Sequence, residues 1–353
     1  MIRTTKAAIL TQINQHLEID ELIIPVLKRG QVLVKIAYSG LCHSQLNEIR
    51  GLKGEDKFLP HTLGHEGSGI VEAVGPGVSK VEPGDHVALT WIKGRGADVP
   101  STLYKNTDDS TVNSGAISTF MTKAVISENR LVKIPQEMPL REAALLGCAI
   151  PTGAGIVLNT ARVQPGNCVA IFGVGGIGLS AVLAAGLVNA APIIAVDVFD
   201  YKLDLARDVG ATHLINAGQE DPLATIMKIT DGRGVDYAIE AAGRRETMES
   251  AFQTVRDNGG RCVLAGNLSQ GERISIDPFD LIKGKQIIGT WGGETDPDRD
   301  IPKYISLYQA GKLKLDELIT DLFTLDEINK AIDVMCRGEI AGRCLIEMPE
   351  RDS

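Results

Sequence analysis

Two cysteines and one histidine are the residues of this sequence best suited to binding a metal ion. Cys42 stands in the run GLCHS, His65 in GHEG, and Cys148 directly follows Gly147. Two thiolates and one imidazole supply three ligands for zinc and leave a fourth position for water or a substrate oxygen, as in catalytic sites. The wide spacing does not by itself bring the three together, and an isolated cysteine is often a small hydrophobic core residue. Both interpretations stay open on spacing alone.

A glycine-rich run predicts a dinucleotide site. The apolar run 168–172 has the character of a buried parallel strand, a helix pattern covers 177–188, and Asp197 follows about 20 residues later. Glycines let the backbone approach a pyrophosphate, and a carboxylate accepts from the ribose hydroxyls of NAD but repels the 2′-phosphate of NADP. Lys202 is a second candidate for the ribose. The alternative is a similar domain without nucleotide. The run G-x-G-x-x-G comprises Gly173, Val174, Gly175, Gly176, Ile177 and Gly178.

These motifs stand in the order found in zinc-dependent medium-chain alcohol dehydrogenases, and the sequence resembles that family over about residues 6 to 348. The resemblance implies an α/β protein: a GroES-like β-rich catalytic domain (1–149 and 291–353) around a Rossmann-type, doubly wound NAD-binding domain (150–290). The motifs that carry it are GLCHS at 40–44, GHEGSGIVEAVGPGV at 64–78, GD at 84–85, GC at 147–148, GVGGIG at 173–178 and GRCLIE at 342–347.

The resemblance also implies roles for individual residues. Cys42, His65 and Cys148 match the ligands of a catalytic zinc. For Trp91 the alternative to a functional role is plain core packing. For Arg343 the alternative is a solvated surface charge. The remaining matches are Glu66 as a carboxylate near the metal, Ser44 as the hydroxyl that passes on the alcohol proton, His43 and Arg343 as pyrophosphate contacts, Thr152 as a nicotinamide contact and Trp91 as a wall of the substrate pocket.

The sequence departs from the family pattern in one segment and at two single positions. Residues 91–120 contain no cysteine, so the four-cysteine structural zinc site of many relatives cannot form there, and we expect one zinc per subunit. Gln45 replaces an aspartate that orients the zinc histidine in many relatives. Asn47 replaces a histidine that ends their proton relay, and asparagine cannot act as a base. The proton is therefore expected to leave through Ser44, the cofactor ribose and water.

The elements that position these residues follow two different patterns. Residues 31–38, 69–74 and 86–90 read as short strands between Gly/Pro turns, and 93–118 as the longest irregular loop. From residue 168, apolar strands alternate with helix patterns, which predicts a doubly wound parallel sheet. The tail from residue 291 returns to helix and turn signals and ends on an apolar strand. The expected elements after 188 are strands at 193–196, 214–216, 236–241 and 261–265 and helices at 203–209 and 248–255.

Composition excludes several classes of protein. The 353 residues suggest two or three domains, and a formal net charge of −9 argues against a general nucleic-acid binder. No apolar run is long enough to span a membrane. The six cysteines show no disulfide framework, and no secretory leader is apparent, so the cytoplasm is the expected compartment. By resemblance we expect a homodimer or homotetramer.

The sequence thus predicts an oxidoreductase that transfers a hydride between an alcohol, or its aldehyde or ketone, and NAD, with one catalytic zinc. A polyol, sugar or cyclitol dehydrogenase of the same superfamily is the alternative, because the loop 93–118 and several charged residues near position 50 suit a polar pocket. A non-catalytic NAD-binding regulatory protein is the third hypothesis, since Gln45 and Asn47 alter the expected site.

Overall fold

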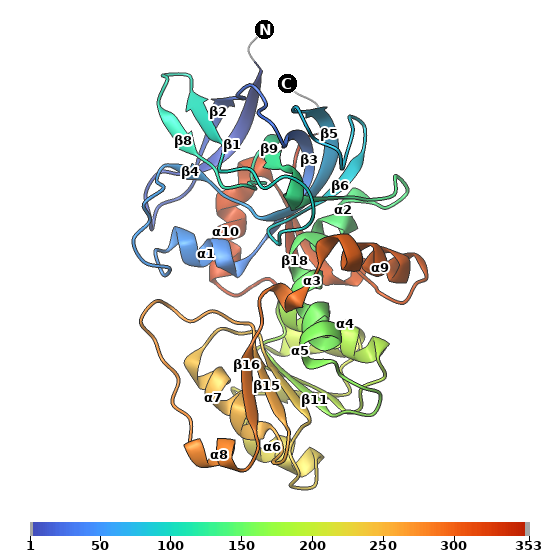
Figure 1. Cartoon of the computed structure of the whole chain (residues 1–353). Helices are drawn as coiled ribbons and strands as arrows, with labels where there is room; N and C mark the ends of the chain where they lie inside the picture. Colours follow the sequence, from blue (N-terminus) through green and yellow to red (C-terminus); the bar gives the residue numbers. More distant parts are fainter. Residues whose placement is uncertain (1–2, 350–353) are drawn as a thin grey trace. The chain divides into compact units, whose positions relative to one another are not determined.

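The chain, seen in a computed structural model that describes residues 3–349, divides into two compact units (Figure 1). The first unit holds the described residues up to Cys148, Asp296–Ser306, and the described residues from Ile319 onward. The second unit holds Ala149–Thr295 and Leu307–Leu318. The chain thus leaves the first unit after Cys148 and returns to it at Asp296 and again at Ile319.

The first unit contains a small closed barrel and a larger sheet. The barrel order is β1 (Thr4–Leu10), β2 (Glu18–Ile23), β7 (Leu103–Asn106), β8 (Thr111–Asn113), β4 (His61–Thr62). The sheet order is β10 (Leu131–Lys133), β6 (His86–Thr90), β5 (Glu66–Val74), β3 (Gln31–Leu41), β18 (Arg343–Glu347), β17 (Ile319–Thr324), and β9 (Lys123–Ser127) also pairs with β3. The helices include α1 (His43–Ile49), α2 (Leu140–Ala143) and α10 (Ile328–Cys336), and α9 (Pro297–Gln309) begins in this unit.

Glycines in the run GHEGSG allow β3 and β5 to lie unusually close. A Cβ atom added to Gly69 would lie 2.2 Å from the Lys35 carbonyl oxygen, and one added to Gly67 would lie 2.6 Å from that of Tyr38. Any side chain at these positions would therefore push the two strands apart. The expected strands 31–38, 69–74 and 86–90 are confirmed, and β3 and β5 are longer than predicted.

The segment 93–118 was expected to be an irregular loop, and this is wrong in part. It contains β7 and β8, which pair with each other and close the barrel. Strands of four and three residues are too short to show the alternation of polar and apolar residues by which a strand is recognised in sequence.

Glu128 fixes the start of this segment to the rest of the first unit. Its buried carboxylate accepts from the backbone N–H groups of Ser79 (2.7 Å), Lys80 (2.9 Å) and Ala97 (2.8 Å). Burial alone would raise the pKa of Glu128, but these donors outweigh burial and hold its pKa below the ordinary value. Nearby, Asp298 accepts from the Arg95 N–H (2.6 Å) and pairs with Lys80 (2.6 Å). Carboxylates thus hold residues 93–98 in place.

The second unit is built on a parallel sheet, as predicted, and this sheet has six strands in the described part of the chain. Its order is β13 (His213–Asn216), β12 (Ile193–Asp197), β11 (Val169–Phe172), β14 (Tyr237–Glu240), β15 (Arg261–Leu264), β16 (Gln286–Gly289). The chain runs outward from β11 to β13 and then returns to β14 on the other side of β11. In such sheets a ligand binds at the carboxyl ends of the strands where this reversal occurs, here between β11 and β14.

Helices follow the strands of this sheet in alternation. The predicted helices 177–188, 203–209 and 248–255 correspond to α4, α5 and α7, while α6 and β16 had not been predicted. A core of buried residues that includes Phe172, Ile194 and Phe252 packs against the sheet. The helices of this unit are α3 (Ala149–Gly155), α4 (Gly176–Leu187), α5 (Asp200–Asp208), α6 (Pro222–Ile229), α7 (Arg245–Thr254) and α8 (Pro278–Ile282), with a π-helical turn at Ile156–Ala161.

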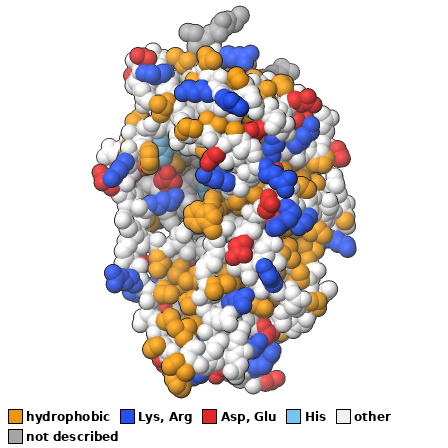
Figure 2. Space-filling view, in the orientation of Figure 1, with side chains coloured by type: hydrophobic (Ala, Val, Ile, Leu, Met, Phe, Trp, Pro, Cys, Tyr) orange, Lys and Arg blue, Asp and Glu red, His pale blue; other side chains and the backbone are white. Residues whose placement is uncertain are grey.

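Lys and Arg side chains are interspersed with Asp and Glu side chains on the face of the molecule shown in Figure 2.

In the described part of the chain, no single helix has the length and apolar character to cross a membrane. The helical segments Leu140–Gly147 and Ala149–Ala161 meet these criteria only as a pair bent by 55°, and their residues are mostly buried in the protein.

The contacts of Glu128 lead to a stability prediction. In Glu128→Gln the side-chain NH₂ would face a backbone N–H that now meets a carboxylate oxygen, so one buried donor loses its acceptor. We expect the free energy of unfolding in urea to fall by about 2 kcal/mol at neutral pH. The lowered pKa of Glu128 means that its contribution exists above the unfolded-state pKa and is lost as pH falls, so wild type and variant should converge in acid.

Glu18→Gln is the matched control, because Glu18 is exposed and its side chain accepts from the exposed Thr11 hydroxyl (2.9 Å) and not from buried backbone N–H groups among residues 3–349. Its unfolding curve should overlay that of the wild type. Equal stability of Glu128→Gln and Glu18→Gln at neutral pH would show that Glu128 does not hold the segment.

Candidate functional site

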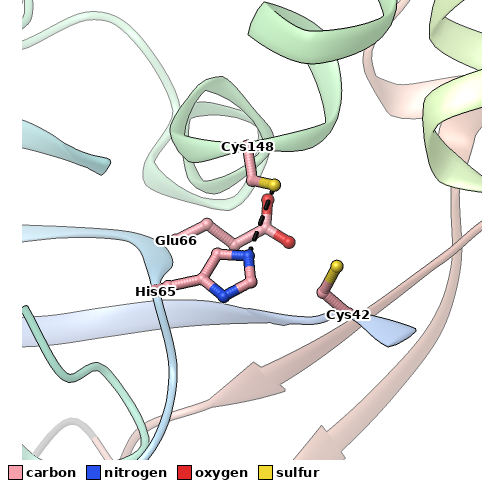
Figure 3. Close-up of side chains that lie close together, drawn as sticks. All are labelled: Cys42, His65, Glu66 and Cys148. Carbon is pink, nitrogen blue, oxygen red and sulfur yellow. Dashed lines mark hydrogen bonds between the residues drawn. The ribbon is translucent and has the colours of Figure 1, made fainter. Parts of the chain in front are cut away.

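The structure brings the three predicted metal ligands together, with Glu66 beside them. Ligand atoms of Cys42, His65, Glu66 and Cys148 all lie within 4.8 Å of one another (Figure 3). Cys42 follows the end of β3, His65 precedes β5, and Cys148 lies between a 3₁₀ turn and α3. The register of β3 and β5, which places Ser39 opposite Gly67, puts Cys42 and His65 at the same end of the sheet.

The donor set fits zinc. The His65 Nε2 atom lies 3.3 Å from Cys148 Sγ, and nitrogen and sulfur ligands on one tetrahedral zinc are about 3.5 Å apart. Hydrogen bonding from the Cys148 thiol holds the pKa of Cys42 well below its ordinary value, despite burial, and His65 acts in the same direction. One thiolate therefore forms readily, and a dication would favour loss of the second proton.

Glu66 and Arg343 form an ion pair inside the first unit. Arg343 Nη2 donates to Glu66 Oε1, and the two residues are 5% and 0% exposed. The interpretation of Arg343 as a solvated surface charge is therefore wrong. Burial opposes the charge on Arg343, but the carboxylate of Glu66 and the two thiols raise its pKa. The Arg343 Nε atom is buried without a hydrogen-bond partner among residues 3–349.

Two glycines make room for this ion pair. A Cβ atom on Gly40 would lie 2.5 Å from the Glu66 carboxylate, and one on Gly147 would lie 2.7 Å from Glu66 Cβ. The side chain of Glu66 therefore passes over the β3 backbone at Gly40 to reach Arg343 on β18. This explains why glycine precedes both Cys42, by two positions, and Cys148.

Gln45 contacts two groups that both require an acceptor. Its Oε1 accepts from the Cys42 backbone N–H (3.2 Å), and its Nε2 lies against His65 Nδ1. When Nε2 of His65 binds a metal, Nδ1 carries the hydrogen and needs an acceptor as well. A carboxylate has an oxygen for each donor, whereas a carboxamide has one oxygen and one NH₂ group. The replacement of aspartate by glutamine thus leaves the support of His65 incomplete.

The neighbours of the ligands lie on a helix. Cys42 is the N-cap of α1, so His43 and Ser44 stand in the first turn of this helix and not in a loop. His43 is exposed, and Ser44 Oγ accepts from Lys53 Nζ (3.0 Å). The Trp91 ring meets the His65 ring edge-on, with centroids 6.5 Å apart.

A cavity of about 350 Å³ lies beside His65 and Gln45. Its wall includes Glu48 and His61, which the sequence analysis had not singled out. His61 Nε2 lies 2.8 Å from Asp56 and 3.8 Å from Glu48. The signal in the sequence was the polar character of residues 48–61, which favours a polar pocket. Asn113, Ser114 and Ser101 add further polar groups to the wall.

In the second unit, the predicted glycine run forms the turn between β11 and α4. Gly175 is the N-cap of α4 and has no side chain to satisfy the first N–H groups of the helix. A Cβ atom on Gly178 would lie 2.0 Å from the Gly173 carbonyl oxygen, whereas one on Gly175 would meet nothing within 4 Å. The turn therefore leaves open space at a helix N-terminus, which fits a pyrophosphate.

Asp197 ends β12 beside this turn. Its carboxylate accepts from the N–H groups of Val174 (2.9 Å), Val198 (2.8 Å) and Phe199 (3.2 Å), so its orientation is fixed. It lines a cavity of about 410 Å³ together with Gly173 and Arg244. Lys202 places Nζ 4.9 Å from the centre of the Phe199 ring. These groups fit the adenosine half of a dinucleotide.

Two further residues of the second unit have a buried polar atom without a hydrogen-bond partner among the described residues. Thr152 is 5% exposed, and its Oγ1 has no hydrogen-bond partner among the described residues. Glu240, which the sequence analysis missed, lies buried at the end of β14, and burial raises its pKa. Its Oε1 accepts from the N–H groups of Ala242 and Gly243, while Oε2 is unmatched in the same described range. Glu240 thus shapes the loop at the reversal of the sheet.

Comparison with known proteins gives consistent matches over nearly the whole chain. Residues 28–136 match the alcohol dehydrogenase GroES-like domain, and residues 176–310 match the zinc-binding dehydrogenase family. The S-(hydroxymethyl)glutathione dehydrogenase of Synechocystis is 34% identical over 95% of this chain and 97% of its own length.

Solved structures agree with these matches. An alcohol dehydrogenase zinc-binding domain protein from Burkholderia ambifaria has a TM-score of 0.91 at 32% identity, covering 99% of this chain and 100% of its own. The benzyl alcohol dehydrogenase of Acinetobacter calcoaceticus has a TM-score of 0.89 at 33% identity, with the same coverage.

The ligand cluster leads to a prediction on metal retention. Cys148→Ala removes one of two thiolates, so we expect the variant to lose its zinc during dialysis while its circular dichroism stays that of the wild type. Cys168→Ala is the control, because Cys168 is equally buried but lies in the second unit. Wild-type zinc content in Cys148→Ala, measured by elemental analysis, would remove Cys148 from the ligand set.

The incomplete support of His65 leads to a second prediction. Gln45→Glu supplies one oxygen for the Cys42 N–H and one for His65 Nδ1–H, so zinc should be held about tenfold more tightly in competition with a chelator. Gln45→Ala, which supplies neither, should hold zinc more weakly than the wild type. The same affinity in all three proteins would show that the side chain at position 45 does not support the ligand.

Proposed function

The chain belongs to the zinc-binding alcohol dehydrogenases of the medium-chain dehydrogenase/reductase superfamily, and from this we propose that it transfers a hydride between an alcohol and NAD. The observation that carries the proposal is the cluster of Cys42, His65 and Cys148 beside a cavity. A GroES-like domain contributes the metal site, and a parallel-sheet domain contributes the nucleotide turn. We assign the metal site to a GroES-like domain of residues 1–149 and 291–353. The nucleotide turn is assigned to a domain of residues 150–290.

In the proposed mechanism, Cys42, His65 and Cys148 hold one catalytic zinc, which when bound polarises the substrate oxygen and lowers the pKa of an alcohol. Glu66 stays in its ion pair with Arg343 and supplies a carboxylate close to the ligands. Ser44 exchanges a proton with the substrate oxygen, and Trp91 forms part of the wall around the substrate. No structural zinc is proposed, because residues 91–120 have no cysteine.

For the cofactor we propose NAD, which supplies the acceptor for the hydride. The turn Gly173–Gly178, including Gly175, Gly176 and Ile177, would hold the pyrophosphate, with His43 and Arg343 as further contacts. Asp197 would accept from the ribose hydroxyls, Lys202 would assist it, and Thr152 would contact the nicotinamide. The support from the structure is the fixed carboxylate of Asp197 and the unmatched atoms of Thr152 and Arg343.

A polyol, sugar or cyclitol dehydrogenase is the second candidate. The wall of the cavity beside His65 includes the polar side chains of Glu48, His61, Asn113 and Ser114 among apolar ones, and such polar groups recognise several hydroxyls of one substrate. We also propose a small-molecule alcohol or carbonyl compound as the partner, rather than nucleic acid or membrane. The cytoplasm is the proposed compartment because all six cysteines are free thiols.

We further propose a homodimer or homotetramer. β16 is the edge strand of the parallel sheet, and the preceding helix α8 carries Phe279 and Ile282, which are 57% and 77% exposed. Open edges and exposed apolar groups of this kind are typical of surfaces that associate.

The function is tested by a substrate panel. Aliphatic, benzylic and polyhydroxy alcohols, and the corresponding carbonyl compounds, are offered with NAD and NADP at matched pH to zinc-loaded protein, and nicotinamide absorbance is followed. We expect turnover with NAD, and the polyhydroxy members decide between the two candidates. Binding of zinc and NAD without turnover of any compound would instead support a regulatory protein.

Cofactor choice gives a separate prediction. Asp197→Gly removes the charge that opposes a 2′-phosphate, so the ratio of kcat/KM with NAD to that with NADP should fall by at least about tenfold. The variant also loses three backbone contacts, which would raise both KM values together without changing the ratio. Asp204→Ala, an exposed carboxylate on α5, is the control. An unchanged ratio in Asp197→Gly would remove Asp197 as the ribose reader.

A further inference from the structure

The ammonium group of Lys53 is hydrogen-bonded to Ser44. Lys53 Nζ lies 3.0 Å from Ser44 Oγ and 2.9 Å from Glu48 Oε2. Ser44 and Glu48 are four residues apart, so they share one face of α1, and Lys53 comes from the turn that follows this helix. Lys53 therefore bridges two side chains on one face of α1, the helix whose N-cap is Cys42.

This arrangement gives Ser44 a route to solvent. The side chain of Lys53 is 46% exposed, while that of Glu48 is 31% exposed and lines the cavity beside His65. A proton on Nζ can therefore exchange with water on one side and lies in hydrogen-bond contact with the Ser44 hydroxyl on the other. Asn47, on the same helix, has no titratable group.

Carboxylate side chains surround the ammonium group of Lys53. Glu48 pairs with it directly, and His61 lies between Glu48 and Asp56. Burial alone would raise the pKa of Asp56, but the N–H of Phe58, His61 and the charge of Lys53 lower it, so Asp56 is a second carboxylate facing this group. The ammonium is thus held in place while its exposed side remains open to water.

We propose that Lys53 is the proton reservoir of the enzyme and acts through Ser44. The inference rests on the proposed function, in which Ser44 exchanges a proton with the substrate oxygen. In carbonyl reduction, hydride from the reduced nicotinamide adds to the carbonyl carbon, Ser44 passes its hydroxyl proton to the substrate oxygen, and an N–H bond of Lys53 breaks to restore the hydroxyl. Lys53 is left as a neutral amine and regains its proton from water. Alcohol oxidation runs the same transfers in reverse.

Three variants test the proposal. Lys53→Met removes the proton donor, Lys53→Arg keeps the charge but does not release its proton, and Lys105→Met is the control. Lys105 has the same exposed fraction, 46%, and is likewise paired with a carboxylate, that of Asp109. Neither Lys53 nor Lys105 is a proposed metal or cofactor ligand, so zinc content and NAD affinity should stay those of the wild type in all three variants.

The expected result is specific to proton transfer. Carbonyl reduction near neutral pH should slow about a hundredfold in Lys53→Met and stay slow in Lys53→Arg, while Lys105→Met matches the wild type. Small primary amines added to Lys53→Met should restore the rate, and the pH profile of the restored rate should follow the pKa of the amine used.

Two outcomes would overturn the proposal. Full activity in Lys53→Arg with no amine effect in Lys53→Met would show that Lys53 only positions Ser44 and Glu48. Unchanged rates and pH profiles in both variants would show that it has no part in turnover. The failure of the proposed function is distinct, because the wild type itself would then turn over no alcohol or carbonyl compound with either nucleotide.

Discussion

The buried ion pair between Glu66 and Arg343 is the constraint on which the candidate metal site depends. Glu66 lies on β5 and Arg343 on β18, which both pair with β3, and β3 leads directly into Cys42. An unpaired charge at this depth would cost several kcal/mol, so the two strands must keep the position that allows the pair to form. Gly40 and Gly147 are required where the Glu66 side chain passes. The same contacts therefore set the backbone positions from which Cys42 and Cys148 project.

In this arrangement the positive and negative charges of the cluster balance when a zinc ion is bound. Two thiolates would match the charge of a zinc dication, and Arg343 already matches Glu66, so the cluster needs no further counter-charge. A carboxylate at position 45 would add a negative charge within this balanced group, whereas Gln45 leaves it unchanged. The cost is geometric, because one carboxamide oxygen has to serve two donors, the Cys42 N–H and His65 Nδ1. A metal bound here would therefore be more electrophilic, while the imidazole of His65 is less firmly oriented.

Local sequence patterns predicted the parallel sheet better than the rest of the fold. The apolar run before Gly173 and the strand ending at Asp197 are buried on both faces, so their composition alone marks them as strands. α6 was missed although Asp221 accepts from the Leu223 and Ala224 N–H groups and Pro222 opens the helix, a start signal present in the sequence. β7 and β8 were missed because strands of four and three residues are too short to show an alternation of polar and apolar residues.

The convergence of the metal ligands could not be derived from spacing. It depends on the register that pairs Ser39 with Gly67 and on the close approach of Gly147 to Leu89 and Glu66, and both are long-range contacts that no local pattern encodes. The order of motifs shared with a known family supplied that information instead. The burial of Arg343 could not be predicted for the same reason, since its partner Glu66 lies far away in the sequence.

The short helix α1 accommodates glutamine at position 45 and asparagine at position 47 because it places two groups of side chains on different faces. A loop after Cys42 would present Ser44 and Glu48 in unrelated directions, whereas one turn of helix stacks them on a single face that Lys53 can bridge. The same helix turns Gln45, which is 2% exposed, inward to His65. Support of the metal ligand and contact with an exposed ammonium group therefore occupy different faces of one element. A change on the Lys53 side need not disturb His65, so the helix allows the proton path and the metal site to vary independently.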